Sequence, residues 1–431
     1  MLKRLILLTT IFGLVSCGGE SETENTQSMP TNRGVNDTEV VLGVYTDLSG
    51  PTAIWGVGAT NAARMRFDEV NANGGVHGRQ IRYVVEDTSY QVHKAMSAAN
   101  KLVNRDDVLA ILMGVGTPLN NAIMPMLFEN GVLNLFPISG GRQMVEPFHP
   151  LKFTQRGIYY DEVRAAVKYF VESKGRTTPC VIYQDTDYGL EILEGATDQA
   201  EAMGLSIAEV SAHKPTDSEF TAAILRLKSA SCDFMLMGTI HHDTILVLEA
   251  ARKMGWEGVD WIGNNAVYAQ VIAEQESGQG FYSFVHMARL YADDEMSPQV
   301  KAWWDRYVEL YGEEPGLPAM EGYRGADLTV LALEKAGPNL RTLCGAEVVN
   351  PRGDLPLHMA LANNASLDVV MAIVDKYEDA CKVRSGSVEF HGELEFRTDG
   401  KFPLQHALIS ESPREVLDLL RKASGLQVVL E

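Results

Sequence analysis

The stretch DEVNANGGVHGRQIRYVVEDT, residues 68–88, contains the end of a helix, a tight turn and a strand. Gly74 and Gly75 end the helical run, and glycine most readily adopts the left-handed conformation that closes a helix. The residues that follow Gly78 are rich in β-branched and aromatic side chains, which are typical of strands. We therefore predict a helix over 59–73 and a strand over 80–86.

The same alternation continues on both sides of this stretch. In the first half of the chain, strands are expected over 40–46, 80–86, 109–113 and 133–136, and helices over 59–73, 92–104 and 119–130. The pattern then restarts, with helices over 160–173, 190–202, 216–231 and 243–254, and strands over 180–184, 206–210, 234–237 and 261–263. Such alternation is typical of parallel sheets with helices on both faces. The predicted fold class is therefore α/β, with two Rossmann-like lobes joined by a hinge.

The two lobes are expected to share crossover segments, because no long proline- or serine-rich linker separates them. A strand-like connector over 281–291 follows the second lobe, and helices over 299–311 and 322–336 are predicted to return to the first. The pair Tyr159 and Tyr160 follows the expected first hinge, which makes one of them a candidate for the space between the lobes.

The charge balance argues against one class of function. The 431 residues include 57 Asp or Glu and 37 Lys or Arg, a formal net charge of −20. A surface of this sign repels phosphate backbones, so we expect no nucleic-acid partner. Hydrophobic residues make up 45% of the chain, which is ample for a buried core.

The first 17 residues are expected to be a targeting segment. Lys3 and Arg4 precede an apolar run over 5–15 that is too short to span a bilayer as a helix and fits a secretory signal. The run ends in LVSC, residues 14–17, which resembles a bacterial lipobox and predicts lipidation of Cys17 and anchoring to a membrane. An ordinary signal peptide with an incidental cysteine is the alternative. Residues 18–38 are polar and are predicted to form a flexible tether.

Several further segments resemble the type I periplasmic binding proteins, the leucine/isoleucine/valine-binding family. The segments are GVYTDLSGPTAIWG at 43–56, the string at 68–79, VEDT at 85–88, GVGT at 114–117, DTDYG at 185–189 and GYRGAD at 322–327. The resemblance covers 39–342 and implies a first lobe of 39–154 and 287–342 and a second of 155–286. It also implies a monomeric receptor, without cofactor or catalytic activity, that delivers a small polar solute to the membrane permease of an ABC transporter.

The ligand site implied by the resemblance lies at the carboxyl ends of the strands, where small polar loops precede helices. The family's ligand positions carry over to Trp55, Thr117, Ser139, Gly140 and Tyr188. The strand ends of the second lobe add His241 and Asn264 as candidates. The family's amino-acid binders have an acidic residue at the later position, where this chain has Asn264 and Asn265. A short amide, a urea-like solute or a carboxylate is therefore as good a candidate as an amino acid.

The C-terminal segment departs from the family. The sequences PLHMAL at 356–361 and PLQHAL at 403–408 each precede a predicted helix and are offset by 47 residues. They resemble ankyrin repeats, whose usual period is about 33 residues. We therefore predict an ankyrin-like α-helical tail over 343–431, with a spurious gene fusion as the alternative. A tail of this kind would also fit a sensory or regulatory receptor that signals to a protein partner.

The remaining motifs favour no enzyme. Cys180 and Cys232 each begin a predicted strand, so either a disulfide or two buried thiols are possible. His241 and His242 lack a third ligand at helical spacing, and a metal site is not expected. No serine–histidine–aspartate arrangement, cysteine–histidine pair or phosphate-binding loop is present, which leaves a hydrolase as the weakest hypothesis.

Overall fold

The computed structural model describes residues 33–337, which belong to one of the two units of the chain, Asn32–Glu431. The predicted signal peptide, Cys17 and the ankyrin-like tail over 343–431 lie outside the described residues. Residues 33–38, the end of the predicted tether, contact the first lobe. There, Arg33 forms an ion pair with Asp107, and the amide of Val41 donates to the carbonyl of Gly34.

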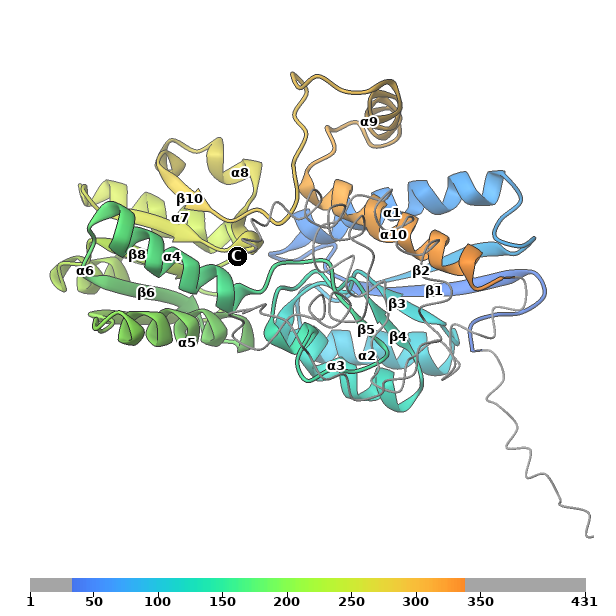
Figure 1. The fold of residues 1–431 in the computed structure, drawn as a ribbon, viewed down its shortest axis with the longest axis horizontal. Coiled ribbons are helices and arrows are strands. Elements are labelled where there is room, and N and C mark those ends of the chain that lie inside the picture. Colours follow the sequence, from blue (N-terminus) through green and yellow to red (C-terminus); the bar gives the residue numbers. More distant parts are fainter. Residues whose placement is uncertain (1–32, 338–431) are drawn as a thin grey trace, which may run out of the picture. The chain divides into compact units, whose positions relative to one another are not determined.

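Two five-stranded parallel sheets form the centres of the two lobes (Figure 1). The first lobe's sheet has the order β2-β1-β3-β4-β5, and the second lobe's sheet has the order β10-β9-β8-β6-β7. The strands are β1 Glu39–Thr46, β2 Gln80–Asp87, β3 Ala110–Leu112, β4 Leu133–Leu135, β5 Lys152–Phe153, β6 Pro179–Gln184, β7 Glu209–His213, β8 Phe234–Gly238, β9 Asp260–Gly263 and β10 Phe281–Ser283. The predicted α/β class with two parallel-sheet lobes is confirmed.

Helices connect successive strands. They are α1 Ala53–Ala72, α2 Val92–Asn104, α3 Thr117–Glu129, α4 Tyr159–Lys174, α5 Asp187–Ala202, α6 Thr221–Ser229, α7 His241–Lys253, α8 Gln270–Ala273, α9 Pro298–Tyr311 and α10 Leu317–Lys335. None of the helices within 33–337 is long and apolar enough to cross a membrane.

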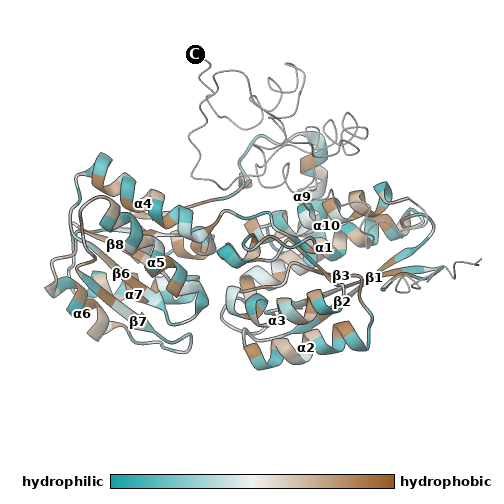
Figure 2. Cartoon of the chain, turned by 60° about the horizontal axis from the view of Figure 1, so that its bottom comes forward, coloured by the Kyte–Doolittle hydropathy of each residue, from teal (hydrophilic) through white to brown (hydrophobic). Residues whose placement is uncertain are grey.

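Each sheet is covered on both faces because its strands bury alternate residues in opposite directions. In β1, Val40 and Leu42 belong to a core with α1 and α10, whereas Val41 and Tyr45 belong to a core with α2 and α3. The second lobe repeats this arrangement, with α6 and α7 on one face and α4 and α5 on the other. Figure 2 shows hydrophobic colour along the strands and mixed colours on the flanking helices.

Helix α1 begins at Ala53, six residues before the sequence pattern predicts. The buried carboxylate of Asp47 accounts for the earlier start, because it accepts hydrogen bonds from the amides of Gly50 and Thr52 and from the Thr52 hydroxyl. These bonds hold the loop that leads into the first turn. As a result, Trp55 is carried on a helix rather than on a loop.

Within the described residues the chain passes between the lobes twice. The first crossover runs from β5 to α4, and the second from β10 to α9, so that α10 returns to the first lobe as predicted. The connector expected over 281–291 is a strand only over Phe281–Ser283, where it adds an edge to the second sheet. Helix α10 lies against α1, and Gly322 is needed there because a β-carbon would stand 2.2 Å from the carbonyl oxygen of Ala59.

Cys180 and Cys232 form a disulfide in the second lobe, with their Cα atoms 5.8 Å apart. Cys180 is in β6 and Cys232 lies just before β8, and these two strands are neighbours in the sheet. Of the two possibilities left open by the sequence, the structure has the bridge.

Candidate functional site

A cavity lies between the two sheets, at the carboxyl ends of their strands. Its empty volume is about 360 Å³, including the space that is open to solvent. The residues that line it are Thr52, Trp55, Tyr90, Val115, Gly116, Thr117, Ile138, Arg156, Tyr159, Tyr188, Ile240 and Ala266. Both lobes and the first crossover contribute to this lining, which is the arrangement expected of a ligand site in open α/β sheets.

The first lobe contributes the start of α3 to the cavity. Gly116, whose φ of +96° requires glycine, turns the chain into the helix, and the Thr117 hydroxyl is 2.7 Å from that of Ser139. The backbone amides of Thr117 and Leu119 have no acceptor within the described residues. Unpaired amides at the start of a 13-residue helix attract anionic groups, because they add to the positive end of the helix dipole.

Arg156, in the first crossover, has the most unusual environment of the lining residues. Its guanidinium lies 4.3 Å from the centre of the Trp55 ring and forms a two-point ion pair with Glu321 of α10, at 2.7 and 2.6 Å. Both charged side chains are almost completely buried. Two-point pairing of this kind fixes the plane of the guanidinium and therefore its stacking on Trp55.

The pKa values of this pair are set by burial and by mutual attraction. Burial disfavours both charges, but the carboxylate of Glu321 more than reverses this for Arg156, whose pKa lies above its usual value. For Glu321, burial by itself would raise the pKa. The positive charge of Arg156, and then His286, outweighs this effect and lowers the pKa below its usual value, to about 2. Both groups are therefore charged at neutral pH.

The second lobe contributes aromatic and apolar surface. The rings of Tyr159 and Tyr188 meet edge to face, with centroids 5.2 Å apart. The Tyr188 hydroxyl donates to the carbonyl of Thr239 at 2.7 Å and accepts from the Asn264 amide at 2.8 Å. Burial raises the pKa of Tyr188 well above its usual value, so the hydroxyl stays protonated.

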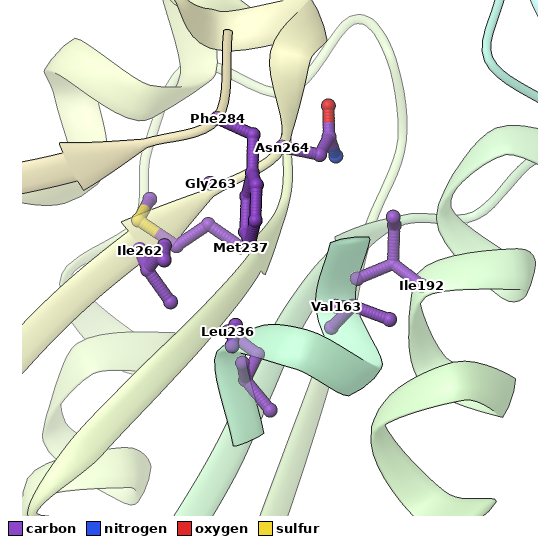
Figure 3. A pocket seen from close by; sticks show the side chains of 9 residues that line it. Val163, Ile192, Leu236, Met237, Ile262, Gly263, Asn264 and Phe284 are labelled. Atoms are coloured by element: carbon purple, nitrogen blue, oxygen red, sulfur yellow. The ribbon is translucent and has the colours of Figure 1, made fainter. Parts of the chain in front are cut away.

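Asn264 faces a second, smaller cavity inside the second lobe. This cavity has an empty volume of about 190 Å³ and is lined mainly by apolar side chains of α4, α5, β8 and β9 (Figure 3). The side-chain oxygen of Asn264 accepts from the amide of Ala266, and its nitrogen donates to Tyr188. Its hydrogen bonds are thus made within the second lobe, and it holds the Tyr188 ring in place.

The sequence candidates fall into three groups. Trp55, Thr117 and Tyr188 line the cavity together. Ser139 and Gly140 do not line the cavity but contact residues that do. The Ser139 hydroxyl contacts Thr117, and the carbonyl of Gly140 accepts a hydrogen bond from the amide of Tyr159.

His241 and Asn264 make up the third group, because neither is among the residues that line the cavity between the lobes. His241 begins α7 and is partly buried. Burial, together with the neighbouring His242, lowers its pKa to about 4 despite the opposing charge of Asp47, so the ring is neutral. Within 33–337 no three His, Cys, Asp or Glu side chains are placed to hold a metal ion.

Arg156 is the principal site residue that the sequence reasoning missed. It comes three residues before Tyr159, which the sequence placed after the hinge and which does line the cavity. The sequence feature that could have identified Arg156 is its position just before the pair Tyr159 and Tyr160. Its partner Glu321 is 165 residues away in the chain, so the pair cannot be found from local pattern.

Hydrogen bonds also join the two lobes directly. The Asn121 amide of α3 donates to Asp187 of α5 at 2.8 Å, and the backbone amide of Arg142 donates to Glu191 of α5 at 2.9 Å. Glu191 also accepts from the amide of Tyr160. Burial raises the pKa of Glu191 to about 7, although the amides of Arg142 and Tyr160 partly counter this effect.

The chain matches the family described as periplasmic binding protein over residues 39–350. The leucine-, isoleucine-, valine-, threonine-, and alanine-binding protein of Pseudomonas aeruginosa is 25% identical over 294 residues, which cover 67% of this chain and 76% of that protein. A Leu/Ile/Val-binding protein of Rhizobium johnstonii is 23% identical over 310 residues, 69% of this chain and 80% of that protein.

Among solved structures, a fatty acid ABC transporter substrate-binding protein from Thermomonospora curvata is similar, with a TM-score of 0.64 and 28% identity. The match covers 72% of this chain and 79% of that one. These relatives are extracytoplasmic binding proteins rather than enzymes, which is a family-level indication against catalysis. This chain belongs to the periplasmic binding protein family, with the type I fold.

Proposed function

We propose that this protein is the extracytoplasmic solute receptor of an ABC importer and that it captures a small polar solute between its two lobes. The observation that carries the proposal is the cavity, because its lining combines Trp55 and Thr117 of the first lobe with Tyr188 and Ile240 of the second. A site shared by two lobes can open and close by rotation about the crossovers.

The relatives support a transport role and leave the solute open. The names of the Pseudomonas aeruginosa and Thermomonospora curvata proteins point to amino acids in one case and a fatty acid in the other. Amino acids, short amides, urea-like molecules and carboxylates therefore all belong in the set of candidate solutes. The implied partner is a membrane permease.

The proposed mechanism assigns different tasks to the lobes. The first lobe receives the solute at the start of α3 and against the stacked pair of Arg156 and Trp55. Closure then brings Tyr188 over the solute and forms the bonds from Asn121 to Asp187 and from Arg142 to Glu191. Release to the permease requires these bonds to break.

The proposal includes the organisation predicted from the sequence. It comprises a signal peptide over 1–17, lipidation of Cys17, a tether over 18–38, a monomeric two-lobe receptor over 39–342 and an ankyrin-like tail over 343–431. The lipid would hold the receptor close to the membrane that contains its permease. Mass spectrometry of the protein purified from membranes tests the lipid directly, because acylation of Cys17 adds mass to the N-terminal peptide.

A ligand screen by thermal shift tests the central proposal. The full chain is melted with amino acids, short amides, urea and small carboxylates, and a true solute at about 100 times its Kd adds about 2.7 kcal/mol of stability. We expect one chemical class to raise the melting temperature. If the protein melts cooperatively and none of these classes shifts it, the receptor proposal for these solutes is wrong.

A further inference from the structure

We infer that the solute is a carboxylate with an apolar or aromatic body and no ammonium group. This inference rests on the proposed receptor function and narrows its candidate solutes to one class. It is carried by the charges and the apolar surface that meet at the cavity.

Among the residues that the structure describes, no acidic side chain that could pair with an ammonium ion lines the cavity. None of its twelve lining residues is an aspartate or a glutamate. The nearby carboxylate of Asp47 already accepts bonds from the amides of Ser49, Gly50 and Thr52 and from the Thr52 hydroxyl. A buried ammonium without a carboxylate partner is strongly disfavoured, so a solute that carries one would be rejected.

By contrast, positive groups gather around the carboxylate of Glu321. Arg156 and Arg324 both interact with Glu321, so two guanidinium groups share one carboxylate. Within residues 33–337, the Arg324 side chain makes no hydrogen bond or ion pair. The other acid close to Arg156 is Glu162, whose pKa burial raises to about 7, so that its charge is incomplete at neutral pH. An added carboxylate could therefore pair with the guanidinium charge that Glu321 leaves unbalanced.

The Nη1 edge of Arg156 is the part of the guanidinium that Glu321 does not occupy. Its Nε and Nη2 atoms are bonded to Glu321, whereas Nη1 makes a long contact of 3.4 Å with the side-chain oxygen of Asn265. The Tyr159 side chain also interacts with the Arg156 guanidinium. A carboxylate can accept from Nη1 and from the tyrosine hydroxyl, and the amides of Thr117 and Leu119 add further donors in the same cavity.

The remainder of the lining favours an apolar body. Eight of the twelve residues are aromatic or aliphatic; they are Trp55, Tyr90, Val115, Ile138, Tyr159, Tyr188, Ile240 and Ala266. The hydroxyl of Tyr188 is occupied by Thr239 and Asn264, so the ring offers mainly its apolar face. Urea or another small amide would leave most of this surface without a partner.

Matched solutes separate the possibilities. Binding of the full chain is measured by titration calorimetry with 4-methylpentanoate, leucine and 4-methylpentanamide, which share one carbon skeleton. The set of 3-phenylpropionate, phenylalanine and 3-phenylpropanamide does the same for an aromatic body. We expect at least one carboxylate to bind ten-fold or more tightly than its matched amino acid and its matched amide.

The outcomes distinguish this inference from the proposed function. If leucine, phenylalanine or either amide binds as tightly as its carboxylate, the inference is overturned and the receptor function stands. If none of the six binds, the inference is also overturned. The receptor function then falls only if the wider thermal-shift screen is negative as well.

A double substitution tests the role of Arg156. Arg156→Gln with Glu321→Gln removes both buried charges together, and we expect it to abolish the ten-fold preference for carboxylate over amide. The matched control is Arg66→Gln with Asp327→Gln, which neutralises a pair at 2.7 Å on the neighbouring helices α1 and α10 outside the cavity, and it should keep the preference. A folded Arg156/Glu321 variant that still prefers carboxylate would contradict the assigned role. If that variant does not fold, the six-solute panel on the natural chain still decides the inference.

Discussion

The two walls of the cavity differ in the state of their polar groups. On the first lobe, the amides of Thr117 and Leu119 have no acceptor within the described residues. The Nη1 atom of Arg156 is not bonded to Glu321. On the second lobe, Tyr188 and Asn264 are bonded to each other and to the backbone. The first wall therefore offers unpaired amides to a solute, whereas the second contributes contact area and water exclusion.

The largest expected effect concerns the ion pair behind the first wall. Glu321→Ala leaves Arg156 charged and buried without its carboxylate, and we expect a loss of about 3–5 kcal/mol in the free energy of unfolding. Asp327→Ala removes the partner of Arg66 in a more exposed pair and should cost about 1 kcal/mol or less. Urea unfolding measures both, and equal losses would mean that the buried pair has no special role.

A second substitution acts on the second lobe alone. Removing the disulfide with Cys180→Ala and Cys232→Ala frees a loop of 52 residues and should cost about 2–4 kcal/mol. If the lobes unfold separately, only the transition of the second lobe should move, which fluorescence and circular dichroism can follow during denaturation. A shift of the whole protein as one unit would show that the crossovers couple the lobes.

Two substitutions that keep an aromatic side chain compare the two walls directly. Trp55→Phe reduces the stacking surface under Arg156 and should weaken binding of the tightest solute about ten-fold, or about 1.4 kcal/mol. Tyr188→Phe removes a hydroxyl that is bonded within its own lobe, so affinity should stay within about two-fold while stability falls by about 1 kcal/mol. Calorimetry and thermal melts give the two quantities. A larger affinity loss for Tyr188→Phe would reverse the assigned roles of the walls.

The smallest effect is the pH dependence that Glu191 gives to the contact between the lobes. Its pKa is raised from 4.5 to about 7, chiefly by burial, so the folded protein holds this proton more tightly than the unfolded chain. The stability from this group is complete below about pH 4.5 and is lost as the pH rises through 7. Glu191→Gln should flatten this part of the melting profile by about 1 kcal/mol or more across the window. An unchanged profile would assign the pH dependence to other groups, such as Glu162, whose pKa is raised in the same direction.

The comparison of the walls also shows where the structure places the site residues predicted from the sequence. Trp55, Thr117 and Tyr188 were proposed because they match family positions next to strand ends, and the strand order brings these ends to one cavity. Asn264 was proposed on the same ground, but it caps a short helical turn and supports Tyr188. Position in the chain placed Tyr188 and Asn264 equally near the site. Only their contacts in the folded protein show that Tyr188 lines the cavity and that Asn264 supports it.

The sequence by itself determined the alternation of strands and helices, the two lobes and the turns that close the helices. These features depend on local patterns of apolar residues and glycines, which are readable within about ten to twenty residues. The tertiary structure decided that Arg156 stacks on Trp55, that Glu321 neutralises it, and that Asp47 lengthens α1 at its start. The physical reason is that a buried charge is tolerated only beside its partner, and the partner of Arg156 comes from a helix that the chain reaches only after building the whole second lobe.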